Sequence, residues 1–355
     1  MLLLGLSPAW SLSLESPAAR EALLLGSGAG CCGWSLALCC AAAAYAAYYY
    51  LRTIAKKPQL VTGSESFCRF LQDHCPVVTE TYYPTVWCWE GRVQTLIRPF
   101  ITDRPYVQYR NELITAADGG QISLDWFDNH DSVPYPDSNS RPTILLLPGL
   151  TGTSKESYIL HMIQQSKTLG YRCVVLNYRG IAGENLLTPR TYCAANTEDL
   201  ETAVNYVHNL YSSAALMASG VSMGGHRRMF DKLFDMNLVM KAKTIREFDK
   251  QFTSVMFGYP TLEDYYADAS PYRRLKRIGI PVLCLNSLDD VFSPDHAIPV
   301  AIAKQNPNVA LILTSYGGHI GFLEGLWPRK CTYMDRVFKQ FVQAVFEHGS
   351  KIFNL

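Results

Sequence analysis

Blocks of apolar residues alternate with amphipathic blocks along the last two thirds of the chain. Residues 106–115 and 121–128 read as two strands joined by a glycine-containing turn, which predicts a hairpin. Unbroken apolar runs, typical of strands buried on both faces, follow at 143–147, 172–177, 215–221, 280–286 and 308–314. Helical periodicity is found at 155–168, 198–210 and 333–348. This order predicts an α/β fold with a mostly parallel central sheet and helices on both faces.

An uncharged stretch near the N-terminus, residues 22–51, exceeds the roughly 20 residues that cross a bilayer. A cleaved signal peptide is the alternative, but its apolar region would be only about 7–15 residues long. We therefore expect a retained transmembrane anchor. Arg20 precedes the stretch and Arg52, Lys56 and Lys57 follow it, so the positive-inside rule places the large domain on the cytosolic side. The organelle stays open.

The anchor divides the chain into expected regions. A GxGxxG match at residues 28–33 lies inside the anchor without a preceding strand, so we do not interpret it as a dinucleotide site. The expected regions are a tail at 1–21, the anchor at 22–51, a connecting arm at 52–104, the catalytic domain at 105–348 and a tail at 349–355.

Composition narrows the possible partners. The 32 basic and 31 acidic residues give a net charge of +1, which provides no electrostatic footprint for nucleic acid. The 11 cysteines include no CxxC pair and no Cys/His cluster with metal-ligand spacing. We therefore expect no nucleic-acid partner, no metal and no cofactor.

Three residues with the chemistry of a hydrolase follow three of the expected strands. Ser222 stands in a G-x-S-x-G turn after residues 215–221, where the glycines allow a sharp bend from strand to helix. Asp290 follows the strand at 280–286, and His319 follows the strand at 308–314. Because ligands meet the carboxyl ends of parallel strands, we expect these side chains to converge. The order Ser, Asp, His is typical of α/β-hydrolases.

These residues predict acyl transfer to water. His319 takes the proton of Ser222, the serine oxygen attacks an ester carbonyl, and Asp290 orients the imidazole. The backbone N–H groups of Met223 and of Leu150, in the loop after residues 143–147, are the expected oxyanion donors. We interpret the other seven histidines as ordinary surface or core residues.

Several segments resemble a known family. "LLLPGLTG", "LNYRG", "GVSMGG", "LNSLDDVFSP" and "TSYGGHIGFLEG" are similar to the YheT-like branch of the α/β-hydrolase domain-containing proteins. The resemblance implies a membrane-anchored phospholipase that cleaves the sn-1 acyl ester of phosphatidylcholines with medium-length or oxidatively shortened chains. It also implies a Ser222, Asp290, His319 triad, in which Pro294 favours Asp290 over Asp289. Phospholipid and the bilayer are the implied partners.

The chain departs from that family after the serine turn. Family members continue into an apolar helix and a further strand, but here the cations His226, Arg227 and Arg228 follow at once. Residues 226–280 contain only one weak strand candidate, 253–259. We therefore expect a shortened isoform that lacks a helix and a strand after residue 225, and we hypothesise that it folds poorly or is inactive.

Two other functions remain open at this point. The first is an acyltransferase, although His319 is followed by Glu324 where an aspartate is sometimes linked to acyl transfer. The second is an inactive splice form that acts as a membrane-tethered scaffold. The sequence does not indicate the oligomeric state.

Overall fold

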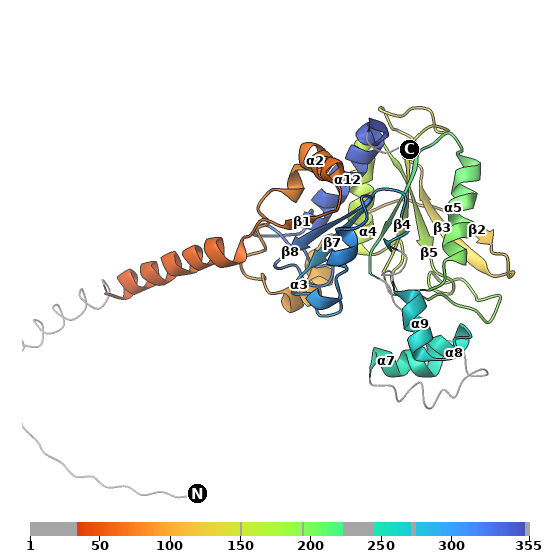
Figure 1. Ribbon diagram of the computed structural model, residues 1–355. Helices are drawn as coiled ribbons and strands as arrows, with labels where there is room; N and C mark the ends of the chain where they lie inside the picture. Colours follow the sequence, from red (N-terminus) through yellow and green to blue (C-terminus); the bar gives the residue numbers. More distant parts are fainter. Residues whose placement is uncertain (1–33, 150, 194, 223–243, 271–274, 352–355) are drawn as a thin grey trace, which may run out of the picture. The chain divides into compact units, whose positions relative to one another are not determined.

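The computed structural model describes residues 34–149, 151–193, 195–222, 244–270 and 275–351. It divides the chain into two compact units, residues 1–53 and residues 54–355. Figure 1 shows the course of the chain through both units. The fold of each unit is described separately.

The first unit consists, in its described part, of one helix. This helix, Trp34–Ile54, is 21 residues long and apolar enough to cross a membrane by length and composition. Its last turn, Tyr50–Ile54, is π-helical. It overlaps the expected anchor at 22–51 and ends three residues later, while residues 22–33 lie outside the described ranges.

Five strands of the second unit form a mixed sheet in the order β2-β3-β5-β4-β6. The strands β2 and β3 are the expected hairpin, and β4, β5 and β6 run parallel to one another. Their bounds are β2 Arg110–Thr115, β3 Gln121–Phe127, β4 Thr143–Leu147, β5 Arg172–Asn177 and β6 Leu216–Gly220. β4 and β5 have the expected bounds, β3 differs from them by one residue at one end and β6 by one residue at each end, and β2 begins four residues later than expected.

Three further strands form a second sheet in the order β1-β8-β7. Strands β7 and β8 are parallel, and β1 pairs antiparallel with β8. Their bounds are β1 Gln59–Val61, β7 Val282–Ser287 and β8 Val309–Thr314. The short edge strand β1 precedes the expected catalytic domain and was not predicted.

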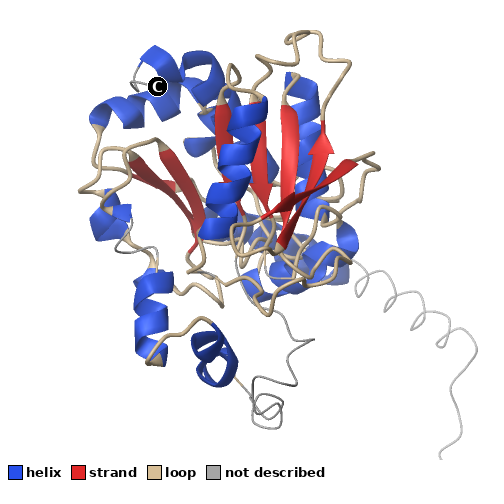
Figure 2. Ribbon diagram, turned by 90° about the vertical axis from the view of Figure 1, so that its right-hand side faces the viewer, coloured by secondary structure: helices blue, strands red, loops and turns tan. Residues whose placement is uncertain are grey.

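Helices lie on both sides of the strands, as the alternating pattern predicts (Figure 2). Those described are α2 Glu65–His74, α3 Gly91–Ile101, α4 Ser157–Leu169, α5 Glu198–Leu210, α7 Ile245–Phe248, α8 Ser254–Met256, α9 Leu262–Ala269, α11 Val300–Ala303 and α12 Tyr333–His348. Local sequence fixes their ends: α12 begins with a capping box of Thr332 and Asp335, and α4 ends at Gly170 in the left-handed conformation.

One hydrophobic cluster packs against both sheets on the same face. It joins Ile144 and Leu146 of β4 to Ala310 and Ile312 of β8 through side chains of α2, α4 and α12. On the opposite face the five-stranded sheet packs against α5, and the three-stranded sheet packs separately against α11. A shared core therefore holds the two sheets together on one side only.

The prediction that residues 52–104 form a connecting arm does not describe this region. Residues 54–104 belong to the compact second unit, and α2 inserts Phe67, Phe70 and Leu71 into the shared core. The prediction failed because the apolar residues of this stretch pack in short helical pieces, whose periodicity is too brief to recognise. The hydrolase unit therefore starts well before residue 105.

The edges of the two sheets differ from their interiors. Every residue of β5 and β8 is buried, whereas no residue of β6 and only Ser287 of β7 is buried. Among the described residues, no strand pairs with the second edge of β6 or of β7. The weak strand candidate at 253–259 was wrong: the chain there forms a π-helical turn, Asp249–Thr253, followed by α8. His226, Arg227 and Arg228 lie outside the described ranges.

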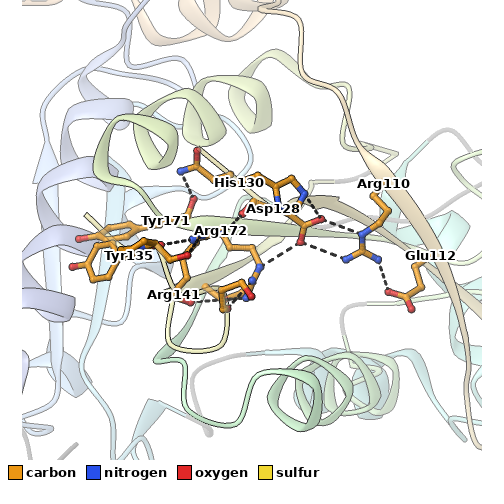
Figure 3. Close-up of polar contacts among 12 residues, drawn as sticks. Arg110, Glu112, Asp128, His130, Tyr135, Arg141, Tyr171 and Arg172 are labelled. Carbon is orange, nitrogen blue, oxygen red and sulfur yellow. Dashed lines mark hydrogen bonds and ion pairs between the residues drawn. The ribbon is translucent and has the colours of Figure 1, made fainter. Parts of the chain in front are cut away.

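A polar network stabilises the far end of the five-stranded sheet (Figure 3). The carboxylate of Asp128 accepts a hydrogen bond from Arg110 at 3.0 Å and pairs with Arg172 at 3.4 Å. The buried Arg141 donates to the Asp128 and Tyr135 carbonyl oxygens at 2.7 and 2.9 Å. These contacts hold the long loop between β3 and β4 against the strands, and they lie away from the serine turn.

Candidate active site

Ser222 lies two residues beyond the end of β6. The strand is continued by one more ladder hydrogen bond, from the Val221 N–H to the Leu147 carbonyl oxygen at 3.1 Å. Ser222 then adopts a φ of 37°, a left-handed conformation that is costly for a residue other than glycine. Such strain at a strand-to-helix turn projects a serine hydroxyl outward, as in a nucleophile elbow.

The three predicted side chains meet. The Ser222 hydroxyl lies 2.5 Å from His319 Nε2, and His319 Nδ1 lies 2.9 Å from a carboxylate oxygen of Asp290. With Nδ1 protonated, the ring donates to Asp290 and Nε2 accepts the serine proton. The ring of Phe292 contacts the imidazole edge-on, with a centroid distance of 4.9 Å. The three side chains therefore lie within hydrogen-bond reach in the order that a nucleophile, a base and a group that orients the base require.

The carboxyl group of Asp290 is held as an anion. Burial pushes its pKa upward, but the hydrogen bond with His319 and those from the N–H groups of Phe292 and Ser293 outweigh burial, so the pKa is lowered overall. An ionised Asp290 can stabilise the imidazolium that forms when His319 takes a proton.

The neighbouring Asp289 points elsewhere. Its carboxylate accepts hydrogen bonds from the Ser287 hydroxyl and, at 2.8 Å, from the N–H of Gly318. Burial raises the pKa of Asp289, against these hydrogen bonds. Of the two adjacent aspartates, Asp290 contacts the imidazole, while Asp289 supports the backbone of the histidine loop.

The histidine loop, residues 317–323, has an unusual backbone. Gly318, Ile320 and Phe322 have φ values of 58°, 53° and 46°, and a left-handed conformation is especially unfavourable for the β-branched Ile320. A Cβ at Gly318 would lie 2.0 Å from the Gly91 carbonyl oxygen, so only glycine fits there. Strain of this kind persists only where the surroundings impose it.

Helix α3 supplies those surroundings. The Thr95 hydroxyl accepts a hydrogen bond from the His319 N–H at 2.8 Å and donates to the Gly91 carbonyl oxygen. The side-chain oxygen of the buried Gln94 accepts from the Leu323 N–H at 2.7 Å. Sequence reasoning missed these residues, because α3 lies in the stretch that was interpreted as an arm.

The two expected oxyanion donors, the backbone N–H groups of Leu150 and Met223, lie outside the described ranges. Three tyrosines hold the chain on either side of Leu150: Tyr158 and Tyr192 accept from the N–H groups of Gly149 and Thr151 at 2.9 and 3.3 Å, and Tyr178 donates to the Pro148 carbonyl oxygen at 3.0 Å. No sequence signal connected these phenols to the loop, since they come from three different segments.

Other candidate groups have structural partners. His161 is buried and lies 3.2 Å from Asp335 and 2.9 Å from the Asp103 carbonyl oxygen. Glu324, which stands where the acyltransferase alternative would favour an aspartate, accepts a hydrogen bond from Arg336 at 2.9 Å. Within the described ranges, no group of three His, Cys, Asp or Glu side chains could hold a metal ion.

The fold and the site together define a class. Strand order β2-β3-β5-β4-β6, followed by the parallel pair β7 and β8, places Ser222, Asp290 and His319 after successive parallel strands. This is the arrangement of the α/β-hydrolase fold.

Comparisons with known proteins extend this assignment. The chain is 63% identical to the phospholipase ABHD3 of Homo sapiens, over 92% of this chain and 93% of that protein, and 62% identical to phospholipase ABHD3 of Mus musculus over 93% of each. The solved structure of the Pyrococcus furiosus esterase Pf2001 aligns with a TM-score of 0.45 and 16% identity, over 69% of this chain and 97% of the esterase. No protein-family model matches the chain. The chain belongs to the ABHD3 family of α/β-hydrolase domain proteins.

The alignment with the human relative also bears on chain length. It spans 385 positions, more than the 355 residues of this chain. The human protein therefore has residues inside the aligned region that this chain lacks. That the missing residues form a helix and a strand after residue 225 stays a prediction.

Proposed function

We propose that this chain is a membrane-anchored serine hydrolase that cleaves acyl esters of phospholipids. Ser222 is the nucleophile, His319 is the general base and acid, and Asp290 orients the imidazole. The observation that carries the proposal is the continuous hydrogen-bonded series from Ser222 through His319 to Asp290. The human and mouse relatives are named phospholipase ABHD3, which supports phospholipid as the substrate class.

The reaction proceeds in two halves. His319 Nε2 takes the Ser222 proton as the serine oxygen attacks the ester carbonyl, and the imidazolium then protonates the departing alkoxide oxygen, which leaves as the hydroxyl of the lysophospholipid. Water, activated by the neutral imidazole, attacks the acyl-serine, releases the fatty acid and restores the serine hydroxyl. Oxyanion stabilisation is assigned to the N–H groups of Leu150 and Met223.

The family resemblance and the first unit refine the proposal. The resemblance favours phosphatidylcholine, the sn-1 ester and medium-length or oxidatively shortened acyl chains. The helix Trp34–Ile54 supports a single membrane span. The three basic residues that follow the uncharged stretch, Arg52, Lys56 and Lys57, favour a cytosolic location for the hydrolase unit.

A paired measurement tests the proposed activity. The purified full chain and its Ser222→Ala variant are incubated with a fluorophosphonate probe and, separately, with phosphatidylcholine vesicles. We expect stoichiometric labelling and fatty-acid release from the unaltered chain, with both lost in the variant. The position of the cleaved ester is read from the lysophosphatidylcholine product: a product that retains only the sn-2 chain shows cleavage at sn-1. Equal fatty-acid release by the two proteins rejects Ser222 as the nucleophile.

A second candidate function is a non-catalytic, membrane-tethered scaffold. The partly exposed strands β6 and β7 favour it, because the serine turn follows β6, which pairs with only one strand among the described residues. Absence of probe labelling in a chain that unfolds cooperatively on heating supports the scaffold. Labelling at Ser222 excludes it.

A further inference from the structure

Helix α3 is amphipathic in the reverse of the usual sense. Its buried residues are Gly91, Gln94 and Arg98, and the Arg98 side chain is only 2% exposed. Leu96 is 71% exposed and Phe100 is 90% exposed. A helix on the surface of a water-soluble domain normally buries its apolar face and exposes its polar face. The outward face of α3 is therefore suited to an apolar environment.

The polar face of α3 is inward, where Gln94 has hydrogen-bond partners, whereas Nε and Nη2 of the buried Arg98 have none among the described residues. Gln94 accepts from the Leu323 N–H and donates to the Trp89 carbonyl oxygen at 3.0 Å. The Arg98 guanidinium lies over the ring of Tyr158, 5.5 Å from its centroid. These contacts fix the rotation of α3 about its axis, so Val93, Leu96 and Phe100, spaced three and four residues apart, all point outward.

More exposed apolar side chains lie beside the N-terminus of α3. The Trp87 indole N–H donates to the Leu326 carbonyl oxygen at 2.8 Å, and its ring packs on that of Trp327 with a centroid distance of 5.9 Å. Trp327 is nevertheless 71% exposed and Leu326 is 62% exposed. We call Trp87, Val93, Leu96, Phe100, Leu326 and Trp327 the α3 apolar surface.

We propose that the α3 apolar surface inserts into the lipid bilayer that carries the substrate. This proposal rests on the proposed function and its membrane anchor. The candidate membrane span ends at Ile54, which is also the first residue of the hydrolase unit, so the span and that unit are consecutive in the sequence. Tryptophans paired at the edge of an apolar helix face suit the interface between headgroups and acyl chains.

Charged residues around the surface also fit a phospholipid. Arg92 is exposed at the start of α3, and Arg104 is exposed just after its end. The Asp103 N–H donates to the Arg329 carbonyl oxygen at 2.8 Å, which places the exposed Lys330 at the same end. Cations at both ends of an apolar stripe can contact phosphate groups while the stripe contacts acyl chains.

The α3 apolar surface leads to the triad. The carboxylate of Asp289 lies against Gly91, where even a Cβ would collide with it, so the loop after β7 abuts the N-terminus of α3. That loop carries Phe292, which is 61% exposed and packs edge-on against His319. The loop that packs against the N-terminus of α3 therefore also carries an exposed aromatic ring that contacts the imidazole.

Photochemical labelling tests the insertion without requiring turnover. The full chain, in a Ser222→Ala background, is reconstituted into phosphatidylcholine vesicles that contain a phosphatidylcholine with a mid-chain diazirine. After irradiation we expect lipid adducts on the tryptic peptide that begins at Val93. The double variant Leu96→Glu, Phe100→Glu should reduce these adducts by about tenfold or more. It loses the favourable free energy of moving two apolar side chains from water into the bilayer. Adducts on the span 34–54 verify reconstitution in each sample.

The matched control is Val133→Glu, which places one glutamate on the loop between β3 and β4, at a residue that is 87% exposed. It should leave the α3 adducts within about twofold of the unaltered level, because this position lies outside the α3 apolar surface. Adducts on the span without adducts on the Val93 peptide overturn the proposal. So does a protein–protein cross-link between two α3 helices, which identifies a second copy as the occupant.

An activity measurement in chains that retain Ser222 separates this inference from the proposed function. Leu96→Glu with Phe100→Glu should slow hydrolysis of vesicle phosphatidylcholine by about tenfold and leave kcat/KM for a soluble short-chain nitrophenyl ester unchanged. Equal slowing of both reactions contradicts a role in lipid docking. Absence of all hydrolysis rejects the proposed function, while the labelling result still decides the docking.

Discussion

Ser222 and His319 come from two sheets with unequal support. His319 follows β8, a fully buried strand, and its loop is hydrogen-bonded to Thr95, Gln94 and Asp289. Ser222 follows β6, a partly exposed strand that pairs only with β4 in the part of the chain that the structure describes. The imidazole is therefore fixed by its surroundings from several directions, whereas the serine is fixed chiefly by one strand. In this chain the integrity of the triad depends on the serine side.

The largest expected effect separates the two aspartates on the histidine side. Asp290→Asn should lower kcat on a soluble ester by about 10³–10⁴-fold, because the amide stabilises the wrong imidazole tautomer. Asp289→Asn should cost about tenfold at most, since it only weakens support for the Gly318 backbone. Steady-state kinetics of both variants provides the check. A greater loss in Asp289→Asn reverses the assignment.

Hydrogen exchange tests the difference between the sheets directly. Amides of β6 and β7 should exchange about 100-fold faster than those of β5 and β8, because partly exposed edge strands open locally at lower free energy. Mass spectrometry of the full chain in detergent micelles resolves the four strands. Equal protection in all four indicates that β6 and β7 are covered in solution, and the contrast drawn above is then wrong.

A smaller effect is expected at Thr95. Thr95→Val removes the acceptor of the His319 N–H, and we expect kcat to fall by about three- to tenfold, the equivalent of one hydrogen bond. KM should not change. In a chain that already carries Asp290→Asn, adding Thr95→Val should lower kcat little further. The matched control is Thr202→Val, whose hydroxyl also bonds the carbonyl oxygen four residues earlier, at 2.8 Å, but contacts no catalytic loop. Equal losses in the two variants would mean that Thr95 acts only within its helix.

The smallest expected effect is on thermal stability, at the β2–β3 turn on the opposite side of the five-stranded sheet from β6. Asp118, in the β2–β3 turn, bonds Arg179 at 2.6 Å, and this hydrogen bond lowers the pKa of Asp118 to about 2. Because the folded pKa lies below the usual 3.8, the stabilisation is complete above about pH 4 and is lost as the pH falls towards 2. Asp118→Asn should lower Tm by about 2–4 °C at pH 6 and by less at pH 2.5, measured by thermal unfolding. Esterase activity at pH 7 should be unchanged, and a constant difference in Tm at both pH values contradicts the linkage.

Sequence reasoning succeeded where a segment has one dominant physical requirement. The strands β4 and β5 were located to the residue because a strand covered on both faces must be apolar throughout, and α12 because its apolar stripe is long. The meeting of Ser222, Asp290 and His319 was foreseen because parallel strands share one carboxyl edge. Whether these residues perform catalysis in this chain stays a prediction.

The same reasoning failed where the requirement is not local. Helix α3 was missed because its apolar residues face outward and its polar residues find partners more than 200 residues away, such as Leu323. The support of the histidine loop by Thr95 was invisible for the same reason. The roles expected of Leu150 and Met223 are backbone roles, which the identity of a side chain does not reveal.

The contact between Gly91 and Gly318 has a practical consequence for trimming this protein. A fragment that starts at the β2–β3 hairpin retains every triad residue and still discards the helix on which the imidazole segment rests. Minimal versions for crystallisation or screening should therefore begin no later than the residues just after the membrane span.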